Sequence, residues 1–159
     1  MPDGNIKDAI ESKIAILNNF CGGPNFSAHL TLLGSFLGPK EILINNTKRL
    51  SKIIKPFRVT FKEIKFSDEF FYSVFISIYP SKELLKARKI SCELFNITDT
   101  NYLPHVSLVY GNYTINKKIK MIQLAKQIPN GFHAEKIFLA FNDEINLRWE
   151  IIKEFKLKK

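Results

Sequence analysis

The chain is poor in the residues that build metal centres and disulfide frameworks. It has two cysteines and three histidines among 159 residues. Cys21 and Cys92 show no metal-ligand spacing and are too few for a disulfide framework. We expect both to be free, half-buried thiols near helix ends, with a bridge between them as the alternative. We also expect no bound metal and no cofactor.

Long apolar runs are absent as well. No stretch approaches the roughly 20 apolar residues that span a bilayer, and the N-terminus lacks the basic-then-apolar layout of a secretion signal. With 45% hydrophobic residues, the chain is long enough for one domain with a substantial core. We therefore expect a single cytoplasmic domain over residues 1–159, without a membrane partner, and favour a monomer slightly over an oligomer.

Arginine is scarce, whereas lysine is abundant. Only four of the 24 cationic residues are arginines, and the formal net charge is +9. A basic surface attracts the phosphates of nucleotides or RNA. The alternative explanation of the positive charge is a genome bias toward Lys, Asn and Ile. The lysines are scattered along the chain and do not cluster, which is consistent with such a bias. The charge therefore gives only mild support for an anionic substrate.

Two short segments are near copies of each other, AHLTLLG in the first half of the chain and PHVSLVYG in the second. Each places a histidine two residues before a hydroxyl residue, His29 before Thr31 and His105 before Ser107. Residues i and i+2 of a β-strand point to the same face. Each segment would therefore present an imidazole and a hydroxyl on one face and its aliphatic residues to the core.

Two such strands lying side by side would bring two imidazoles and two hydroxyls into one small volume. Two imidazoles can supply a base and an acid at once, because one is neutral and the other protonated. The hydroxyls of Thr31 and Ser107 can donate hydrogen bonds to phosphate oxygens on which negative charge accumulates. The pattern predicts acid–base chemistry on a phosphate, with His29 and His105 as the catalytic pair.

Apolar periodicity and turn residues divide the chain into two halves, about 5–79 and 81–156, with the same order of elements. The first half is expected to contain a helix over 5–20, a strand over 28–34, a helix over 40–53, and strands over 57–66 and 70–79. The second is expected to contain a helix over 81–95, a strand over 104–110, a helix over 116–128, and strands over 132–141 and 147–156.

This repeat predicts an α+β fold of bilobal, pseudo-two-fold architecture. Neither half alone could bury its sheet, so the halves belong to one domain. Helices would coat the outer faces of two antiparallel sheets, with the site in the central groove between them.

Aromatic residues on the strand expected over 70–79 are candidates for stacking on a nucleobase. We consider Phe70, Phe71 and Tyr72, although strand aromatics more often pack in a core. Trp149 lies in the middle of an expected strand and is predicted to be core packing. His133 lacks a hydroxyl two residues later and is predicted to lie at the surface or at a strand end.

The paired HLTL and HVSL segments, one in each half, resemble the two signature motifs of the 2H phosphoesterases. The strings GGPNF, PHVSLVYG and RWEII are similar to the cyclic phosphodiesterase branch of plants and yeast. The resemblance implies metal-independent hydrolysis of 2′,3′-cyclic phosphates, or of ADP-ribose 1″,2″-cyclic phosphates. It also implies His29 as acid, His105 as base, and Thr31 and Ser107 as phosphate ligands.

The same resemblance makes Tyr110 the counterpart of a tyrosine that follows the second motif in the branch. Strict alternation would put Tyr110 on the face opposite His105, so a substrate-binding role requires the strand to bend or end before Gly111.

Two alternatives keep the same fold. One is cleavage of 2′,5′-linked oligonucleotides or processing of RNA 3′ ends, and the other is RNA binding without catalysis. Binding alone does not require matched imidazoles, so the repeated histidine and hydroxyl pair favours an enzyme. The expected partner is a cyclic nucleotide or an RNA end.

Overall fold

The computed structural model describes residues 1–24, 26–34, 37–98, 101–143 and 148–158. The elements along the chain are α1 (Gly4–Cys21), α2 (Lys40–Ile53), β1 (Phe57–Phe66), the 3-10 helix η1 (Phe70–Tyr72), β2 (Val74–Ile78), α3 (Lys82–Phe95), β3 (His105–Val109), α4 (Ile115–Leu124), β4 (Gly131–Ala134), β5 (Lys136–Asp143) and β6 (Arg148–Lys156). None of these described helices is both long enough and apolar enough to cross a membrane.

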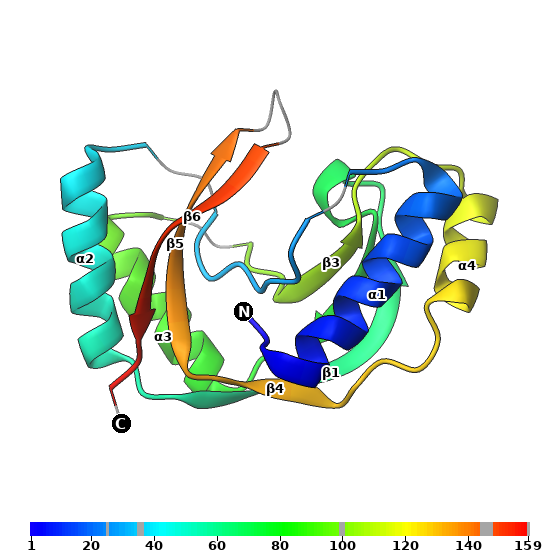
Figure 1. The fold of residues 1–159 in the computed structure, drawn as a ribbon. Helices are drawn as coiled ribbons and strands as arrows, with labels where there is room; N and C mark the ends of the chain where they lie inside the picture. The colour runs from blue at the N-terminus through cyan, green and yellow to red at the C-terminus, as the bar shows by residue number, and fades with distance from the viewer. Residues whose placement is uncertain (25, 35–36, 99–100, 144–147, 159) are drawn as a thin grey trace.

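The elements form two lobes, each built from both halves of the chain (Figure 1). One lobe contains α1 and α4 with the strands β1, β2 and β3, and the other contains α2 and α3 with the hairpin β5–β6. The strands make an antiparallel four-stranded sheet, in the order β3-β2-β1-β4, and a separate two-stranded sheet. The predicted bilobal α+β fold with two antiparallel sheets is confirmed. That the whole chain is one domain stays a prediction.

The first three helices begin and end where the sequence pattern predicts. In α1, Ile10, Ile14 and Leu17 are buried at helical spacing, and Gly22 ends the helix in a left-handed conformation with φ 77°. In α3, the Ser81 side chain accepts a hydrogen bond from the amide of Leu84 and caps the N-terminus. Cys21 and Cys92, on these two helices, are free and half-buried, as predicted.

The strand predicted over 70–79 is wrong in its first part, where η1 takes the place of a strand. Ser67 closes this turn, because its amide donates to the Ser73 carbonyl at 3.1 Å and its hydroxyl donates to the Tyr72 carbonyl at 2.9 Å. Such local hydrogen bonds compete with the sheet ladder. They leave Phe71 and Tyr72 off the sheet, before β2 begins.

The strand predicted over 132–141 is divided between the two sheets. β4 pairs with β1 in the larger sheet, and β5 pairs with β6 in the hairpin. At the change of sheet, the carbonyl of Glu135 accepts a hydrogen bond from the Leu157 amide at 2.8 Å. One extended stretch of chain therefore joins the lobes along their base (Figure 1).

The fourth helix is shorter than the predicted range 116–128. It ends at Leu124, and Gln127 then adopts a left-handed φ of 68°. At the start of β4, Gly131 has φ 134°, and a Cβ there would collide with the Val59 carbonyl oxygen. The approach of β4 to β1 therefore requires glycine at this position. The strands predicted over 104–110 and 147–156 are β3 and β6, and residue 147 lies outside the described residues.

Candidate active site

The two histidine motifs lie side by side, although the first is not the regular strand predicted over 28–34. Within its described residues, one antiparallel bridge joins Leu30 to Val106 of β3. The next two carbonyls of the first motif accept hydrogen bonds from side chains. The Tyr102 hydroxyl donates to the carbonyl of Thr31, and the Arg88 guanidinium donates to the carbonyl of Leu32. These bonds take the place of a ladder, which is why the segment does not extend into a strand.

The bridge joins the middle residues of the two motifs. Across an antiparallel pair centred there, His29 stands opposite Ser107, and Thr31 stands opposite His105. The register of this bridge sets residues 29 and 31 against residues 107 and 105, and all four of these residues line one cavity.

The same local hydrogen bond orients both imidazoles. Nδ1 of His29 lies 2.7 Å from the carbonyl oxygen of Ser27, and Nδ1 of His105 lies 2.7 Å from that of Leu103. A carbonyl can only accept, so Nδ1 carries the proton in both rings. Nε2 then has a lone pair in the neutral ring and a proton in the cation. Each ring can serve as a base or as an acid through the same atom.

Burial is the largest influence on both imidazoles and lowers the pKa of His29 and of His105 below the ordinary value of 6.5. The backbone hydrogen bonds act in the opposite direction. Positive charge on the N-terminus and on His105 lowers the pKa of His29 further. Both rings are therefore mainly neutral at neutral pH in the free protein. A bound phosphate anion would raise both pKa values.

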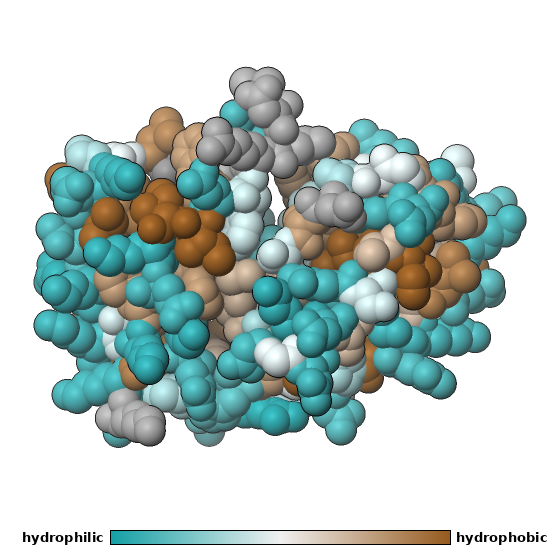
Figure 2. Space-filling view, viewed as in Figure 1, coloured by the Kyte–Doolittle hydropathy of each residue, from teal (hydrophilic) through white to brown (hydrophobic). Residues whose placement is uncertain are grey.

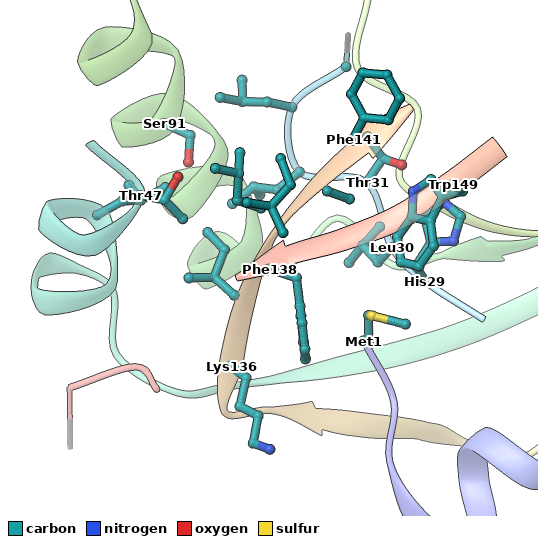
Figure 3. Close-up of a pocket in the computed structure, with 18 of the residues that line it drawn as sticks. Met1, His29, Leu30, Thr31, Thr47, Ser91, Lys136, Phe138, Phe141 and Trp149 are labelled. Carbon is teal, nitrogen blue, oxygen red and sulfur yellow. The ribbon is translucent and has the colours of Figure 1, made fainter. Parts of the chain in front are cut away.

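Each imidazole also packs against an aromatic ring. His29 stacks on Trp149 of β6, with ring centroids 5.1 Å apart and planes at 15° (Figure 3). His105 packs against Tyr72 at 4.9 Å and meets Phe75 edge-on at 5.5 Å. The two histidines thus have similar backbone partners and different ring partners.

The prediction that Trp149 is core packing is wrong, because its indole lines the cavity described below. A bulge in β6 explains why the regular alternation of strand faces could not predict the side to which Trp149 points. Lys153 pairs with Leu139 and Ile151 pairs with Ala140, so Ile152 is an extra residue without a partner on β5. An extra residue of this kind moves the residues that precede it to the opposite face of the strand.

A second bulge places Tyr110 at the site. In β3, Leu108 has no partner on β2. The extra residue changes the alternation, and the strand ends at Val109, so Tyr110 lines the same cavity as His105 and Ser107. Burial raises the pKa of Tyr110 to about 12, and a hydrogen bond with Ser107 acts against this rise. The phenol is therefore a proton donor at neutral pH.

The two hydroxyl residues differ in their surroundings. Ser107 is 5% exposed, and its Oγ donates to the carbonyl of Phe71 at 2.8 Å. Thr31, in contrast, is exposed. The Ser107 hydroxyl would have to turn away from Phe71 to donate to any ligand, whereas the Thr31 side chain is accessible from solvent.

All four motif side chains line a cavity of about 820 Å³ between the lobes. Figure 2 shows the surface hollowed there, with apolar side chains gathered on both sides. Of the three predicted stacking residues, Phe71 and Tyr72 line the cavity, whereas Phe70 lies outside the lining set and packs edge-on against Phe71 at 5.1 Å. Phe26 adds a ring that stacks on Tyr110 at 4.0 Å.

The third histidine is remote from this chemistry, as predicted. The side chain of His133 on β4 is 51% exposed and lies 3.7 Å from the Glu135 carboxylate. Within the part of the chain that the structure describes, no group of three or more His, Cys, Asp or Glu side chains could hold a metal ion.

The single tryptophan offers a direct measurement of the His29 pKa. A protonated imidazole in contact with an indole quenches its fluorescence. Because burial lowers the pKa of His29, we expect Trp149 emission to fall on acidification with a midpoint below pH 6.5. A fluorescence titration of the free protein checks this.

The controls for this titration are His29→Gln and His105→Gln. The first should abolish the transition, and the second should keep it with a slightly higher midpoint, because a positive neighbour is lost. A midpoint at or above 6.5 in the native protein would contradict the burial argument.

Comparison with solved structures defines the class of fold. The chain is similar to a crystal structure described as a phosphoesterase, at 13% identity over 99% of this chain and 96% of that one, with TM-score 0.62. It is similar to TT0787 of Thermus thermophilus at 16% identity, over 96% and 91% of the two chains, with TM-score 0.62. It is also similar to E. coli LigT complexed with 3′-AMP at 13% identity, over 98% and 95%, with TM-score 0.62.

At these identities the likeness shows the fold alone, which is that of the three solved structures named above. No curated protein sequence matches the chain significantly. The family model described as cyclic phosphodiesterase-like protein matches residues 2–159. The chain belongs to this family, within the 2H phosphoesterase superfamily, and the resemblance noted from the paired motifs is confirmed at that level.

Proposed function

We propose that the protein hydrolyses 2′,3′-cyclic phosphates of nucleotides or RNA ends, or the related 1″,2″-cyclic phosphate of ADP-ribose, without a metal, as plant and yeast cyclic phosphodiesterases do. The observation that carries the proposal is the antiparallel bridge between Leu30 and Val106. It supports an arrangement in which His29 and His105 approach one phosphorus from opposite sides. In-line displacement requires that arrangement, because the attacking and leaving oxygens lie on opposite sides of phosphorus.

In the proposed reaction, neutral His105 accepts a proton from water at Nε2 while the water oxygen attacks phosphorus. The bond from phosphorus to one ribose oxygen breaks, and protonated His29 gives its Nε2 proton to that oxygen. The product is a ribose phosphomonoester with one free hydroxyl. His105 ends protonated and His29 neutral, and exchange with solvent restores both.

Thr31 and Ser107 donate hydrogen bonds to the two non-bridging oxygens, where charge accumulates in the transition state. Tyr110 lies next to Ser107 and stays protonated, so it can donate to the same phosphate or replace the Phe71 carbonyl as a partner of Ser107.

A nucleoside is the substrate class that the cavity wall supports best. The rings of Phe26, Phe71, Tyr110 and Trp149 all line the cavity and give flat apolar surfaces on which a base can stack. The structure of E. coli LigT with 3′-AMP supports a nucleotide for this chain as well.

The decisive experiment is turnover of adenosine 2′,3′-cyclic phosphate with EDTA present. We expect a phosphomonoester product, followed by phosphorus NMR, at a rate that EDTA does not change. The NMR spectrum also distinguishes the 2′ from the 3′ monoester. Parallel reactions with ADP-ribose 1″,2″-cyclic phosphate and a 2′,5′-linked dinucleotide rank the substrate classes.

Absence of turnover with all three substrates would overturn the proposal. If RNA then bound with strong salt dependence, the protein would be a binding module of the same fold.

A further inference from the structure

The first motif keeps its shape without the ladder hydrogen bonds of a strand. The carbonyl of Thr31 accepts a hydrogen bond from the Tyr102 hydroxyl at 3.2 Å, and the carbonyl of Leu32 accepts one from Nη1 of Arg88 at 2.6 Å. In a regular strand, neighbouring amides would supply such donors. Here both donors are side chains from the second half of the chain, one on α3 and one shortly before β3.

The two donors also contact each other. The guanidinium carbon of Arg88 lies 4.8 Å from the ring centre of Tyr102, and Arg88 is only 6% exposed. A buried cation needs compensation, which the ring face and the carbonyl provide here. Burial raises the pKa of the Tyr102 phenol, so its hydroxyl remains a donor at working pH. We call the Arg88–Tyr102 pair the brace.

The brace is connected to the second motif as well. Tyr102 precedes Leu103, whose carbonyl accepts the Nδ1 proton of His105. The position of residues 102 and 103 therefore fixes the Thr31 backbone on one side and the His105 ring on the other.

We propose that Arg88 and Tyr102 are positioning residues which hold the first motif in register with the second. This inference rests on the proposed phosphodiesterase function. Neither residue of the brace is among those that line the cavity, and both bond to the backbone of the first motif, at Thr31 and Leu32. Without it, the Thr31 hydroxyl would lose its alignment with the phosphate, while both histidines would keep their Nδ1 hydrogen bonds.

The central test is Tyr102→Phe, which removes one hydroxyl and keeps the ring over Arg88. We expect kcat/KM for adenosine 2′,3′-cyclic phosphate to fall about tenfold, the order of effect of one well-placed hydrogen bond. Part of the loss should lie in kcat, because the Thr31 contact strengthens in the transition state. The pH profile should stay unchanged, since both imidazole environments are intact.

Tyr79→Phe is the matched control. Tyr79 is 50% exposed and lies outside the cavity-lining set. Its variant should keep the native kcat and KM. Arg88→Lys keeps the charge but loses the planar fork, so it should cost more than Tyr102→Phe. If Arg88→Lys does not fold, Tyr102→Phe alone decides the question.

A second measurement does not depend on turnover. Amide hydrogen exchange over residues 28–34 should be faster in Tyr102→Phe than in the native protein or in Tyr79→Phe, and exchange in β2 should be unchanged. If exchange is faster in Tyr102→Phe but the native protein hydrolyses none of the three substrates, the result supports the brace as a restraint on the first motif and overturns the proposed function.

Two results would overturn the positioning role. One is a Tyr102→Phe variant that matches Tyr79→Phe in both exchange and kinetics. The other is faster exchange together with native kcat and KM, because the brace would then be only structural.

Discussion

Replacement of His29 or His105 by glutamine is expected to lower kcat on a 2′,3′-cyclic nucleotide by about 10²- to 10⁴-fold, the usual contribution of a positioned acid or base. Glutamine can keep a hydrogen bond to the carbonyl of Ser27 or Leu103 but cannot carry a proton to or from the substrate. Initial rates with and without each substitution provide the measurement, and thermal melting checks that the fold remains.

The control for these variants is His133→Gln, because that side chain is half-exposed and lies outside the cavity lining. It should retain native rates. The double variant of His29 and His105 should have about the same kcat as the slower of the two single variants. The effects of groups that act as a unit on kcat are not additive. A single variant that retains a tenth of native kcat would contradict the paired mechanism.

A change of leaving group separates the acid from the base. A 4-nitrophenyl phosphodiester releases a phenolate that needs no proton. On this substrate His29→Gln should recover most of its lost rate, and His105→Gln should not, if His29 is the acid. The opposite pattern would exchange the two roles while leaving the rest of the mechanism in place.

Loss of either hydroxyl is expected to have the second largest effect. Thr31→Val and Ser107→Ala should each lower kcat by about 10²- to 10³-fold, as for the removal of one donor to a developing oxyanion. Steady-state kinetics on adenosine 2′,3′-cyclic phosphate provides the measurement. Thr60→Val, on an exposed position of β1, is the control and should keep native kinetics.

The two hydroxyl variants should differ in stability. Ser107→Ala removes the 2.8 Å donor of the Phe71 carbonyl from a part-buried hydrogen bond, so it should also cost about 1 kcal/mol in unfolding free energy. Thr31 is exposed, and valine has the same shape, so Thr31→Val should unfold like the native protein. Equal kinetics in Thr31→Val and the native protein would remove Thr31 from the proposed site.

The helices and the pairing of the two motifs were predictable because they depend on local patterns. Apolar residues such as Ile10 and Leu17 recur at helical spacing, and the His29 and His105 segments are near copies of each other. The side-by-side position of these segments followed from the repeat alone, and the bridge at Leu30 bears it out.

What the sequence could not predict depends on contacts between distant residues. The bulges at Leu108 and Ile152 are set by partner strands, and they determine which face Tyr110 and Trp149 occupy. The hydrogen bond from Arg88 joins residues 56 positions apart, so no window along the chain could show that it replaces strand pairing.

The bridge between the motifs has a consequence for the direction of cleavage. A half-turn about its axis exchanges the two histidines and the two hydroxyls, so these four groups alone cannot distinguish one ribose oxygen of a cyclic phosphate from the other. The distinction falls to groups that break the symmetry, the indole beside His29 and the phenol beside His105. If the proposed reaction takes place, we expect Trp149 and Tyr72 to contribute to the choice of ribose oxygen, and exchanging the ring types at these two positions should change the ratio of 2′ to 3′ product.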